Sequence, residues 1–522
     1  MRVLYCGRIL TIAEPLYAES MLVEDGYIVD VGNRNELSKR YPDADLVEFS
    51  GVMMPAFIDA HSHFSMNAGY MAQCDVRGAK SLAEVVCRVR AYIDKKHIMP
   101  GEWIVANNYD HTVFDDVEPP KLSEIDAICP NNPLVLRHRS AHMIVANYAA
   151  LNIGAVTEAD ADSSPNFEIK DGKLTGCLKE GAAQRVTKYI PPQSVNQLFD
   201  AVTETCRFYT SRGITTVQDG GIGQRSLDLY KLINGVGELD VDIVAYISGS
   251  ANYAPLKECF DSFNRMENFS VGGIKAFLDG SPQLRTAWVR KPYLTEDTCY
   301  RQSVSDDKLI NAFCTAAKHN TQILVHCNGD AAIEQFLRCL EVAEKDHPIL
   351  KELKPVIIHA QLMGRDQLPK AKELGAVVSF FVAHCYHWGD VHLENLGEER
   401  GMRISPVGSA IELGVDYTFH QDAPVILPDM LETVWCAVNR ITRNGVKLAE
   451  DERISVLDAL KGVTVNAARQ YSCEKLKGTV EKGKYADLVL LDKDPLVVDP
   501  MDIRSIKVKK TYRRGICVYS AE

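Results

Sequence analysis

The chain has 522 residues, a formal net charge of −12, and 46% hydrophobic and 25% charged residues. This length exceeds one ordinary domain but suits a barrel of about 250 residues or more with additions, and the composition is that of a folded protein with a large core. The acidic balance argues against a nucleic-acid or anionic-membrane surface, so a small molecule is the expected partner.

Other features of the composition bear on location. No apolar stretch approaches the roughly 18 residues needed to cross a bilayer, and the first residues carry no apolar export segment followed by a cleavage site. The 15 cysteines are scattered singly, without a CxxC pair. We therefore expect a cytoplasmic protein with buried thiols. The oligomeric state stays open, with a homodimer as one expectation.

Short apolar and β-branched runs, separated by Asp, Gly and Pro turn residues, occur at both ends of the chain. They are residues 8–12, 20–23 and 27–31 near the N-terminus, and 486–491, 506–508 and 515–519 near the C-terminus. We expect the two ends to share one sheet, in a composite domain made of residues 1–52 and 476–522.

Between these ends, apolar β-branched runs alternate with longer helical stretches, which is typical of a parallel sheet covered by helices. The predicted strands are residues 53–58, 213–218, 241–247, 273–277, 322–325, 355–358, 376–380 and 415–419. Eight such strands predict an α/β fold, a (β/α)8 TIM-like barrel over residues 53–475. About 150 residues separate the first two strands. That is far more than one connection needs, so an inserted subdomain is expected at about 70–205.

Residue types that bind metals or reacting groups fall at the C-terminal ends of five predicted strands. They are His61, His63, Lys275, His326, His359 and Asp422. In a barrel all these ends converge on one face, where active sites lie. A single HxH pair is weak evidence, but a convergent set of His and Asp side chains is what a metal requires. The sequence therefore predicts a metal site at this face.

Several motifs carry a family resemblance over nearly the whole chain. Residues 51–63 (GVMMPAFIDAHSH) resemble the strand-one signature of the amidohydrolase superfamily, except that Ala56 stands where the signature usually has glycine. One branch, amidohydrolase family 3, includes N-substituted formamide deformylases, and it is resembled by residues 273–281 (GIKAFLDGS), 325–331 (VHCNGDA), 358–361 (IHAQ), 421–424 (QDAP) and 478–489 (GTVEKGKYADLV). The resemblance implies a β-sandwich built from both termini, a metal-bearing barrel, and hydrolysis of a non-peptide carbon–nitrogen bond.

Lys275 is the most informative of these positions, because an ordinary ammonium group beside a dication would be repelled. The resemblance implies that carbon dioxide carboxylates this lysine. The resulting carbamate would bridge two metal ions, expected to be Zn²⁺, with His61 and His63 on one ion and His326 and His359 on the other. The alternative is a structural lysine paired with Asp279 beside a single metal.

Asp422 is expected to lie on or beside a metal, where it takes a proton from the attacking water and delivers it to the leaving nitrogen. Its alternative is a turn or helix-capping aspartate before Pro424. Asp59 is expected to orient a metal-binding histidine rather than to bind metal itself.

Substrate-binding candidates follow from position and from the resemblance. His384, His387 and Trp388 come after a predicted strand, so they could reach the barrel mouth, although loop packing would explain them equally well. Arg285 could hold a substrate carboxylate through paired hydrogen bonds, or it could be an ordinary surface arginine. The resemblance adds His142, in the inserted region.

The main functional hypothesis is a hydrolase acting on an amide-like bond of an N-acyl, N-formyl or cyclic compound. One alternative is a deaminase acting on a heterocycle, which in this superfamily usually needs an HxxE glutamate. Here Gly329 occupies that third position after His326. A second alternative is a regulatory or ligand-binding member of the fold, which would be expected to have lost a metal ligand.

Overall fold

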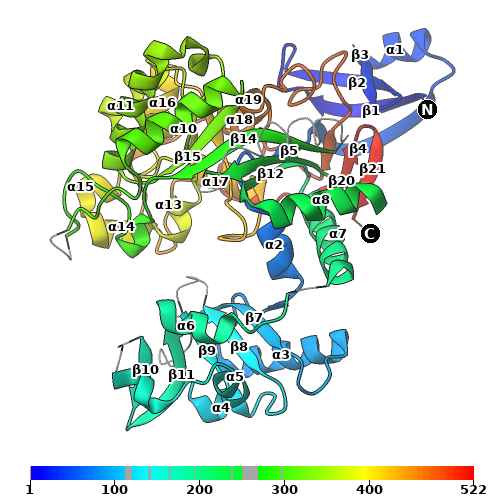
Figure 1. Ribbon diagram of the computed structural model, residues 1–522. Coiled ribbons are helices and arrows are strands. Elements are labelled where there is room, and N and C mark those ends of the chain that lie inside the picture. Colours follow the sequence, from blue (N-terminus) through cyan, green and yellow to red (C-terminus); the bar gives the residue numbers. More distant parts are fainter. Residues whose placement is uncertain are drawn as a thin grey trace. The chain divides into compact units, whose positions relative to one another are not determined.

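The computed structural model describes residues 2–111, 114, 120–138, 143–162, 164, 166–192, 194–236, 239–249, 268–294 and 298–521. The chain divides into two compact units, one made of residues 1–64 and 206–522 and the other of residues 65–205 (Figure 1). Within the described ranges, none of the helices is both long and apolar enough to span a membrane.

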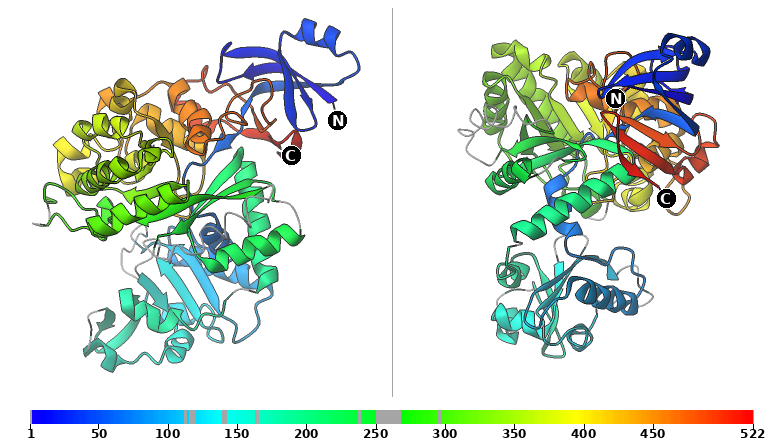
Figure 2. Two further views of the ribbon diagram at one scale, coloured as in Figure 1. Left: turned by 45° about the horizontal axis from the view of Figure 1, so that its top comes forward. Right: turned by 90° about the vertical axis from the view of Figure 1, so that its right-hand side faces the viewer.

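A seven-stranded sheet in the larger unit is built from both ends of the chain, in the order β21-β20-β19-β4-β1-β2-β3. Figure 2 shows the ends marked N and C at this sheet. Strand β4 joins the two halves, because it pairs parallel with β1 and antiparallel with β19. The strands are β1 (Arg2–Leu10), β2 (Tyr17–Glu24), β3 (Tyr27–Gly32), β4 (Asp45–Pro55), β19 (Leu488–Leu491), β20 (Val508–Arg513) and β21 (Ile516–Ser520). These strands form a single sheet, so the second layer of the expected sandwich stays a prediction.

The same unit contains a curled sheet of eight parallel strands, in the order β18-β17-β16-β15-β14-β13-β12-β5. Its strands are β5 (Phe57–Ile58), β12 (Ile214–Ile222), β13 (Asp242–Ser248), β14 (Phe269–Phe277), β15 (Gln322–Cys327), β16 (Val356–His359), β17 (Val377–Phe380) and β18 (Tyr417–Phe419). Every ladder between neighbours is parallel, which confirms the predicted α/β class.

The first and last strands of this sheet are brought together just beyond their C-terminal ends. The backbone N–H of Asp422 donates to the carbonyl oxygen of His61 at 3.2 Å, and that of His63 donates to the carbonyl of Ala423 at 2.9 Å. Among the described residues no strand ladder joins β5 to β18, so full closure into a barrel stays a prediction.

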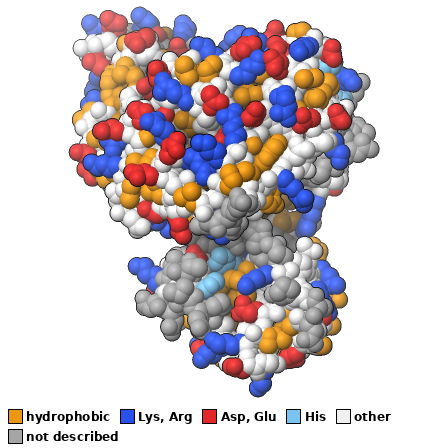
Figure 3. All heavy atoms as spheres, turned by 90° about the vertical axis from the view of Figure 1, so that its left-hand side faces the viewer, with side chains coloured by type: hydrophobic (Ala, Val, Ile, Leu, Met, Phe, Trp, Pro, Cys, Tyr) orange, Lys and Arg blue, Asp and Glu red, His pale blue; other side chains and the backbone are white. Residues whose placement is uncertain are grey.

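Helices cover the eight-stranded sheet because they carry apolar residues on one face. In α10 (Asp306–Lys318), for example, Leu309, Ala312, Phe313 and Ala316 are buried. The other helices of this unit include α1 (Arg34–Arg40), α8 (Gln224–Val236), α11 (Asp330–Asp346), α12 (Leu368–Glu373), α13 (His384–His387), α14 (Gly389–Leu396), α15 (Glu398–Gly401), α16 (Val407–Leu413), α17 (Met430–Asn439), α18 (Val456–Gly462) and α19 (Val465–Gln470). On the face drawn in Figure 3, acidic and basic side chains of the larger unit are interspersed.

The smaller unit has its own six-stranded sheet, in the order β10-β11-β9-β8-β7-β6. Its strands are β6 (Cys74–Asp75), β7 (Ile104–Tyr109), β8 (Leu134–His138), β9 (Met143–Ala146), β10 (Phe167–Lys170) and β11 (Lys173–Lys179), and its helices are α3 (Leu82–Lys96), α4 (Leu122–Asp126), α5 (Tyr148–Ile153) and α6 (Glu180–Thr187). Helices α2 (Phe64–Met71) and α7 (Val195–Ser211) lie at the boundaries of this unit. His142 lies outside the described residues.

Candidate metal centre

The predicted ligands all lie at the carbonyl ends of strands in the eight-stranded sheet. His61 and His63 follow β5 and Asp422 follows β18, while the other three lie within their strands: Lys275 in β14, His326 in β15 and His359 in β16. The backbones of His359 and Asp422 are left-handed, with φ of 77° and 54°. Non-glycine residues adopt this conformation at an energetic cost, and such residues cluster at functional sites.

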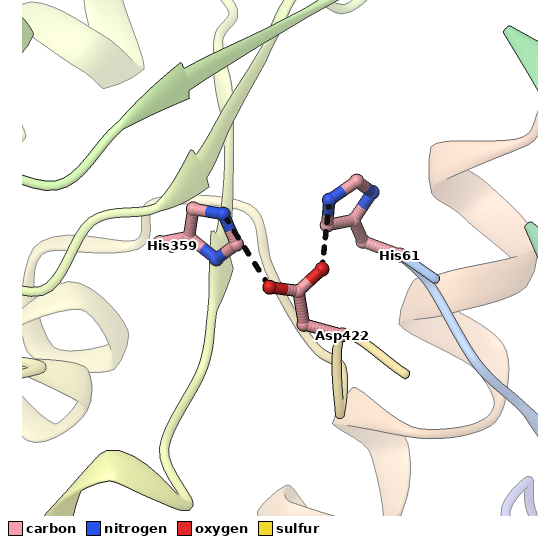
Figure 4. A group of neighbouring side chains, drawn as sticks. All are labelled: His61, His359 and Asp422. Carbon is pink, nitrogen blue, oxygen red and sulfur yellow. Dashed lines mark ion pairs between the residues drawn. The ribbon is translucent and has the colours of Figure 1, made fainter. Parts of the chain in front are cut away.

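The carboxylate of Asp422 is the centre of the group. Its Oδ1 lies 3.4 Å from Nε2 of His61 and 3.4 Å from Nε2 of His63, and its Oδ2 lies 3.9 Å from Nε2 of His359. In Figure 4 the carboxylate lies between the rings of His61 and His359. One ligand atom from each of these three residues lies within 4.8 Å of the others, close enough to share one metal ion.

Hydrogen bonds behind two of the rings determine which nitrogen carries the proton. His63 Nδ1 lies 2.7 Å from the carbonyl oxygen of Gly220, which can only accept, so Nδ1 is the donor. His61 Nδ1 lies 2.5 Å from Oε1 of Gln218, whose Nε2 donates to the carbonyl of Ala60 at 2.9 Å. In its neutral form, each ring therefore presents the lone pair of Nε2 to Asp422.

His326 is oriented by Asp279, whose Oδ1 lies 3.1 Å from Nδ1 of the ring. The same carboxylate accepts backbone N–H groups from Asn328 at 3.0 Å, Gly329 at 2.7 Å and Trp288 at 3.1 Å. Asp279 is therefore committed to His326 and to the backbone. The alternative pairing of Asp279 with Lys275 is not among the ion pairs of the described residues.

Lys275 is fully buried, and its Nζ lies 3.2 Å from Nε2 of His61. The ammonium form is costly here, so burial lowers the pKa of Lys275 to about 7, although the negative charge of Asp422 opposes that shift. At neutral pH, a large fraction of the molecules therefore carries Lys275 as a neutral amine. The neutral amine is the form that reacts as a nucleophile.

Two of the histidines are held neutral, and the aspartate is held charged. Burial lowers the pKa of His61 and His359 well below the usual value. Burial alone would raise the pKa of Asp422, but contact with His63 and the nearby His420 and Lys275 lowers it below the usual carboxyl value. Neutral imidazole and ionised carboxylate are the protonation states that bind metals.

The donors fit a divalent cation. Among the described residues, none is a hydrogen-bond partner of the buried Oδ1 of Asp422, yet this atom faces Nε2 of His61 and Nε2 of His63. Acceptors that face one another in a buried space are unfavourable unless a positive charge lies between them. An imidazole and carboxylate set of this kind suits zinc and related metals.

Sequence reasoning missed two residues of this centre and misplaced a third. His420 lies 3.0 Å from Nδ1 of His359, and it could have been found because it follows β18 just as Asp422 does. Gln218 carried no signal beyond its place in a predicted strand. Asp59 was expected to orient a histidine side chain, but its Oδ1 instead accepts the backbone N–H of Gln421 at 3.4 Å.

The candidate substrate residues from α13 are only partly placed near the metal ligands. The rings of His384 and Phe381 are 4.6 Å apart, and Phe381 lies 6.1 Å from the ring of His359. Trp388 packs on His384, with ring centroids 4.5 Å apart. These contacts extend an aromatic cluster from His359.

His387 is held by other side chains, since Glu432 lies 2.9 Å from its Nε2 and Arg443 lies 2.9 Å from its Nδ1. Arg285 is half-buried and left-handed, with φ of 58°, directly after the turn Pro282–Leu284. The substrate roles of these residues stay predictions.

The sequence matches the model of the Amidohydrolase family over residues 50–519. The chain belongs to the amidohydrolase family. Within the terminal sheet, residues 21–44 also match an imidazolonepropionase-like composite domain of bacteria. The family assignment confirms the resemblance seen in the strand-end motifs.

Relatives of this amidohydrolase-family chain match over nearly its full length. The N-substituted formamide deformylase of Arthrobacter pascens is 26% identical and covers 96% of this chain and 95% of its own, and Protein LONG AFTER FAR-RED 3 of Arabidopsis thaliana is 27% identical, with 96% and 88% covered. The crystal structure of an uncharacterized metal-dependent hydrolase from Pyrococcus horikoshii superposes with a TM-score of 0.78 at 25% identity, covering 96% of this chain and 99% of that one.

Proposed function

We propose that this chain is a metal-dependent hydrolase that cleaves a carbon–nitrogen bond, other than a peptide bond, in a small molecule. The observation that carries the proposal is the convergence of Nε2 of His61 and Nε2 of His63 on the buried Oδ1 of Asp422, for which the described residues supply no hydrogen-bond partner. One relative is named as an N-substituted formamide deformylase, and this name supports an amide-like substrate for the present chain.

The residues that would hold the metal are His61, His63 and Asp422, with His326 and His359 for a second ion. We propose two zinc ions, with Lys275 between the two pairs of histidines. Such ions lower the pKa of a water molecule and polarise the scissile carbonyl.

Asp422 is the residue that moves protons. It is ionised at neutral pH, because its pKa is held below the ordinary carboxyl value. It can therefore accept a proton from the attacking water at Oδ1 and later deliver that proton to the leaving nitrogen. Its backbone is left-handed, with φ of 54°, and its carboxylate lies within 3.4–3.9 Å of the rings of His61, His63 and His359.

Lys275 is proposed to carry a carboxyl group. The lone pair of its neutral amine attacks the carbon of carbon dioxide, a nitrogen–carbon bond forms, and one proton is released to solvent. The product is a carbamate anion, which removes the repulsion between an ammonium group and a metal. A native mass spectrum at low temperature should show the added mass of one carbon dioxide, which Lys275→Met should lack. A wild-type mass equal to that of the unmodified sequence, with the metal retained, would contradict the modification.

Two other functions remain as alternatives. Deamination would release ammonia from a heterocycle. It is disfavoured because Gly329 stands where an HxxE motif that begins at His326 would have its glutamate. A purely ligand-binding role is disfavoured because the described site retains both histidine pairs and Asp422.

The proposal is tested by a turnover screen of metal-loaded protein. N-formyl amines, N-acyl amines, N-acyl amino acids and cyclic amides are the expected substrate classes, and dipeptides and aminated heterocycles are the comparison classes. Hydrolysis of an amide class that stops with Asp422→Asn supports the proposal. Turnover of only a dipeptide or a heterocycle would replace the proposed bond class, and silence with every compound would favour a binding protein.

A further inference from the structure

His359 differs from the other histidines of the metal centre in what lies behind its ring. His63 and His61 face oxygen atoms of Gly220 and Gln218, and His326 faces the carboxylate of Asp279. His359 Nδ1 instead lies 3.0 Å from Nε2 of a second imidazole, that of His420. An oxygen acceptor leaves no choice about where the ring proton lies, whereas an imidazole nitrogen can either donate or accept.

The second imidazole is itself bonded to a hydroxyl. His420 Nδ1 lies 2.8 Å from Oγ of Ser379, and the side chains of His420 and Ser379 are both fully buried. Ser379 pairs across the sheet with Ile358 and Thr418, so its position is set by two strand ladders. The three side chains His359, His420 and Ser379 form a chain of hydrogen bonds, which we call the relay.

The relay has two possible settings. In one, the Ser379 hydroxyl donates to His420 Nδ1 and His420 Nε2–H donates to His359 Nδ1, which leaves the proton of His359 on Nε2. In the other, every bond is reversed, and Nε2 of His359 is a free lone pair. Only the second setting allows His359 to bind a metal, because its Nε2 faces Asp422 Oδ2 at 3.9 Å while its Nδ1 is occupied by His420.

We propose that His420 is a positioning residue that, together with Ser379, holds the proton of His359 on Nδ1 and so presents Nε2 to the metal. This inference rests on the proposed metal centre. His420 acts through His359 and makes no contact with the metal itself. Hydrogen-bond partners behind a metal-binding imidazole typically account for a 10- to 100-fold change in metal affinity.

The test measures metal affinity directly. Metal-free protein is titrated with Zn²⁺ in competition with a chromophoric chelator, and the visible spectrum of the Co²⁺-loaded protein reports the coordination. His420→Phe removes the acceptor but keeps an aromatic ring, and it should weaken metal binding about 10- to 100-fold. His420→Gln offers an amide oxygen that can accept the Nδ1–H of His359, and it should recover much of the affinity. Ser379→Ala should weaken Zn²⁺ binding less than His420→Phe does, by about fivefold.

A matched control is available in the same unit. His392 Nε2 lies 3.0 Å from Nδ1 of His384 in another buried imidazole pair, and this hydrogen bond involves none of the proposed metal ligands. His392→Phe should therefore leave both the Zn²⁺ affinity and the Co²⁺ spectrum unchanged. Thermal unfolding of each metal-free variant shows whether it is folded. If His420→Phe is not folded, Ser379→Ala decides: weaker Zn²⁺ binding supports the relay, and unchanged binding overturns it.

The outcomes separate this inference from the proposed function. If the wild-type protein binds no divalent metal, both the metal centre and the relay are overturned. If it binds metal and folded His420→Phe binds it equally well with the same Co²⁺ spectrum, only the relay is overturned. Weakened binding in His420→Phe, partial recovery in His420→Gln and no change in His392→Phe support it.

Discussion

Nε2 of His63 lies 3.4 Å from Oδ1 of Asp422, and both atoms are hydrogen-bond acceptors once His63 Nδ1 donates to the carbonyl of Gly220. Two buried acceptors repel unless a cation binds between them. This relationship ties the protonation state of the ring to the function of the site.

Replacing Asp422 with asparagine should remove proton transfer while keeping the shape of the side chain. We expect kcat on the substrate found in the turnover screen to fall about 10²- to 10⁴-fold, which is the usual contribution of a general acid or base. Metal content, measured by elemental analysis, shows whether the fall in kcat comes instead from loss of the metal. A variant that keeps its metal and its full kcat would rule out the role of Asp422.

Replacing Gln218 should remove the hydrogen bond that orients the ring of His61. Gln218→Met removes the oxygen that accepts the Nδ1–H of His61 at 2.5 Å, so Zn²⁺ affinity should fall about 10- to 100-fold. Gln361→Met is the control, because Gln361 is equally buried but donates to the carbonyl oxygen of Phe381 at 3.2 Å instead of contacting a ligand histidine. Equal affinity losses in the two variants would mean that general destabilisation, not the orientation of His61, is responsible.

Replacing Asp279 should affect stability as well as the metal. Asp279→Ala leaves four donors without their acceptor. They are the Nδ1–H of His326 and the backbone N–H groups of Asn328, Gly329 and Trp288. Each unsatisfied buried donor costs about 1–3 kcal/mol, so the free energy of unfolding in urea should fall by at least about 3 kcal/mol. Asp279→Asn keeps an acceptor oxygen, so its free energy of unfolding should fall less than that of Asp279→Ala. If the two variants unfold at the same urea concentration, these hydrogen bonds contribute little to stability.

Asp242 forms a buried ion pair that should make stability depend on pH. Burial alone would raise the pKa of Asp242, but Lys477 at 2.5 Å and Arg513 at 2.7 Å lower it to about 2. The unfolded carboxyl titrates near 3.9, so the stabilisation from this charge is complete above about pH 4 and disappears as the pH falls through 2.

Asp242→Asn should therefore reduce the free energy of unfolding by about 3–5 kcal/mol at pH 7, and the difference from the wild-type protein should shrink as the pH falls from about 4 to about 2. The exposed pair of Arg365 and Glu412 supplies the control, since Glu412→Gln should cost less than about 1 kcal/mol at any pH. A difference for Asp242→Asn that stays constant with pH would contradict this assignment.

The parts of the site that could be predicted depend on short-range patterns. The eight β-branched runs could be recognised because strand character shows in a few consecutive residues. Parallel strands place their C-terminal ends at one edge, so His326, His359 and Asp422 were expected to lie near one another without any knowledge of the register. The structure brings His61, His359 and Asp422 into one group, and the ring of His326 lies 4.5 Å from that of His359.

The partners behind the ligands could not be predicted in the same way. The hydrogen bond between His61 and Gln218 joins residues 157 positions apart, and the bond between His326 and Asp279 joins residues 47 apart. Such bonds depend on ångström-level register between strands and on the path of each loop, which no local pattern encodes. His420 was missed for this reason, although its place after β18 was visible.

The amino-acid sequence by itself determined the α/β class, the family and the edge of the sheet where the chemistry lies, because these follow from local periodicity and from motifs of a few residues. Only the tertiary structure decided that Asp279 bonds His326 rather than Lys275, that Asp59 serves the backbone, and that His420 lies behind His359. The physical reason is that a hydrogen bond needs its two atoms within about 3 Å, and that distance is set by the packing of strands and loops far apart in the chain.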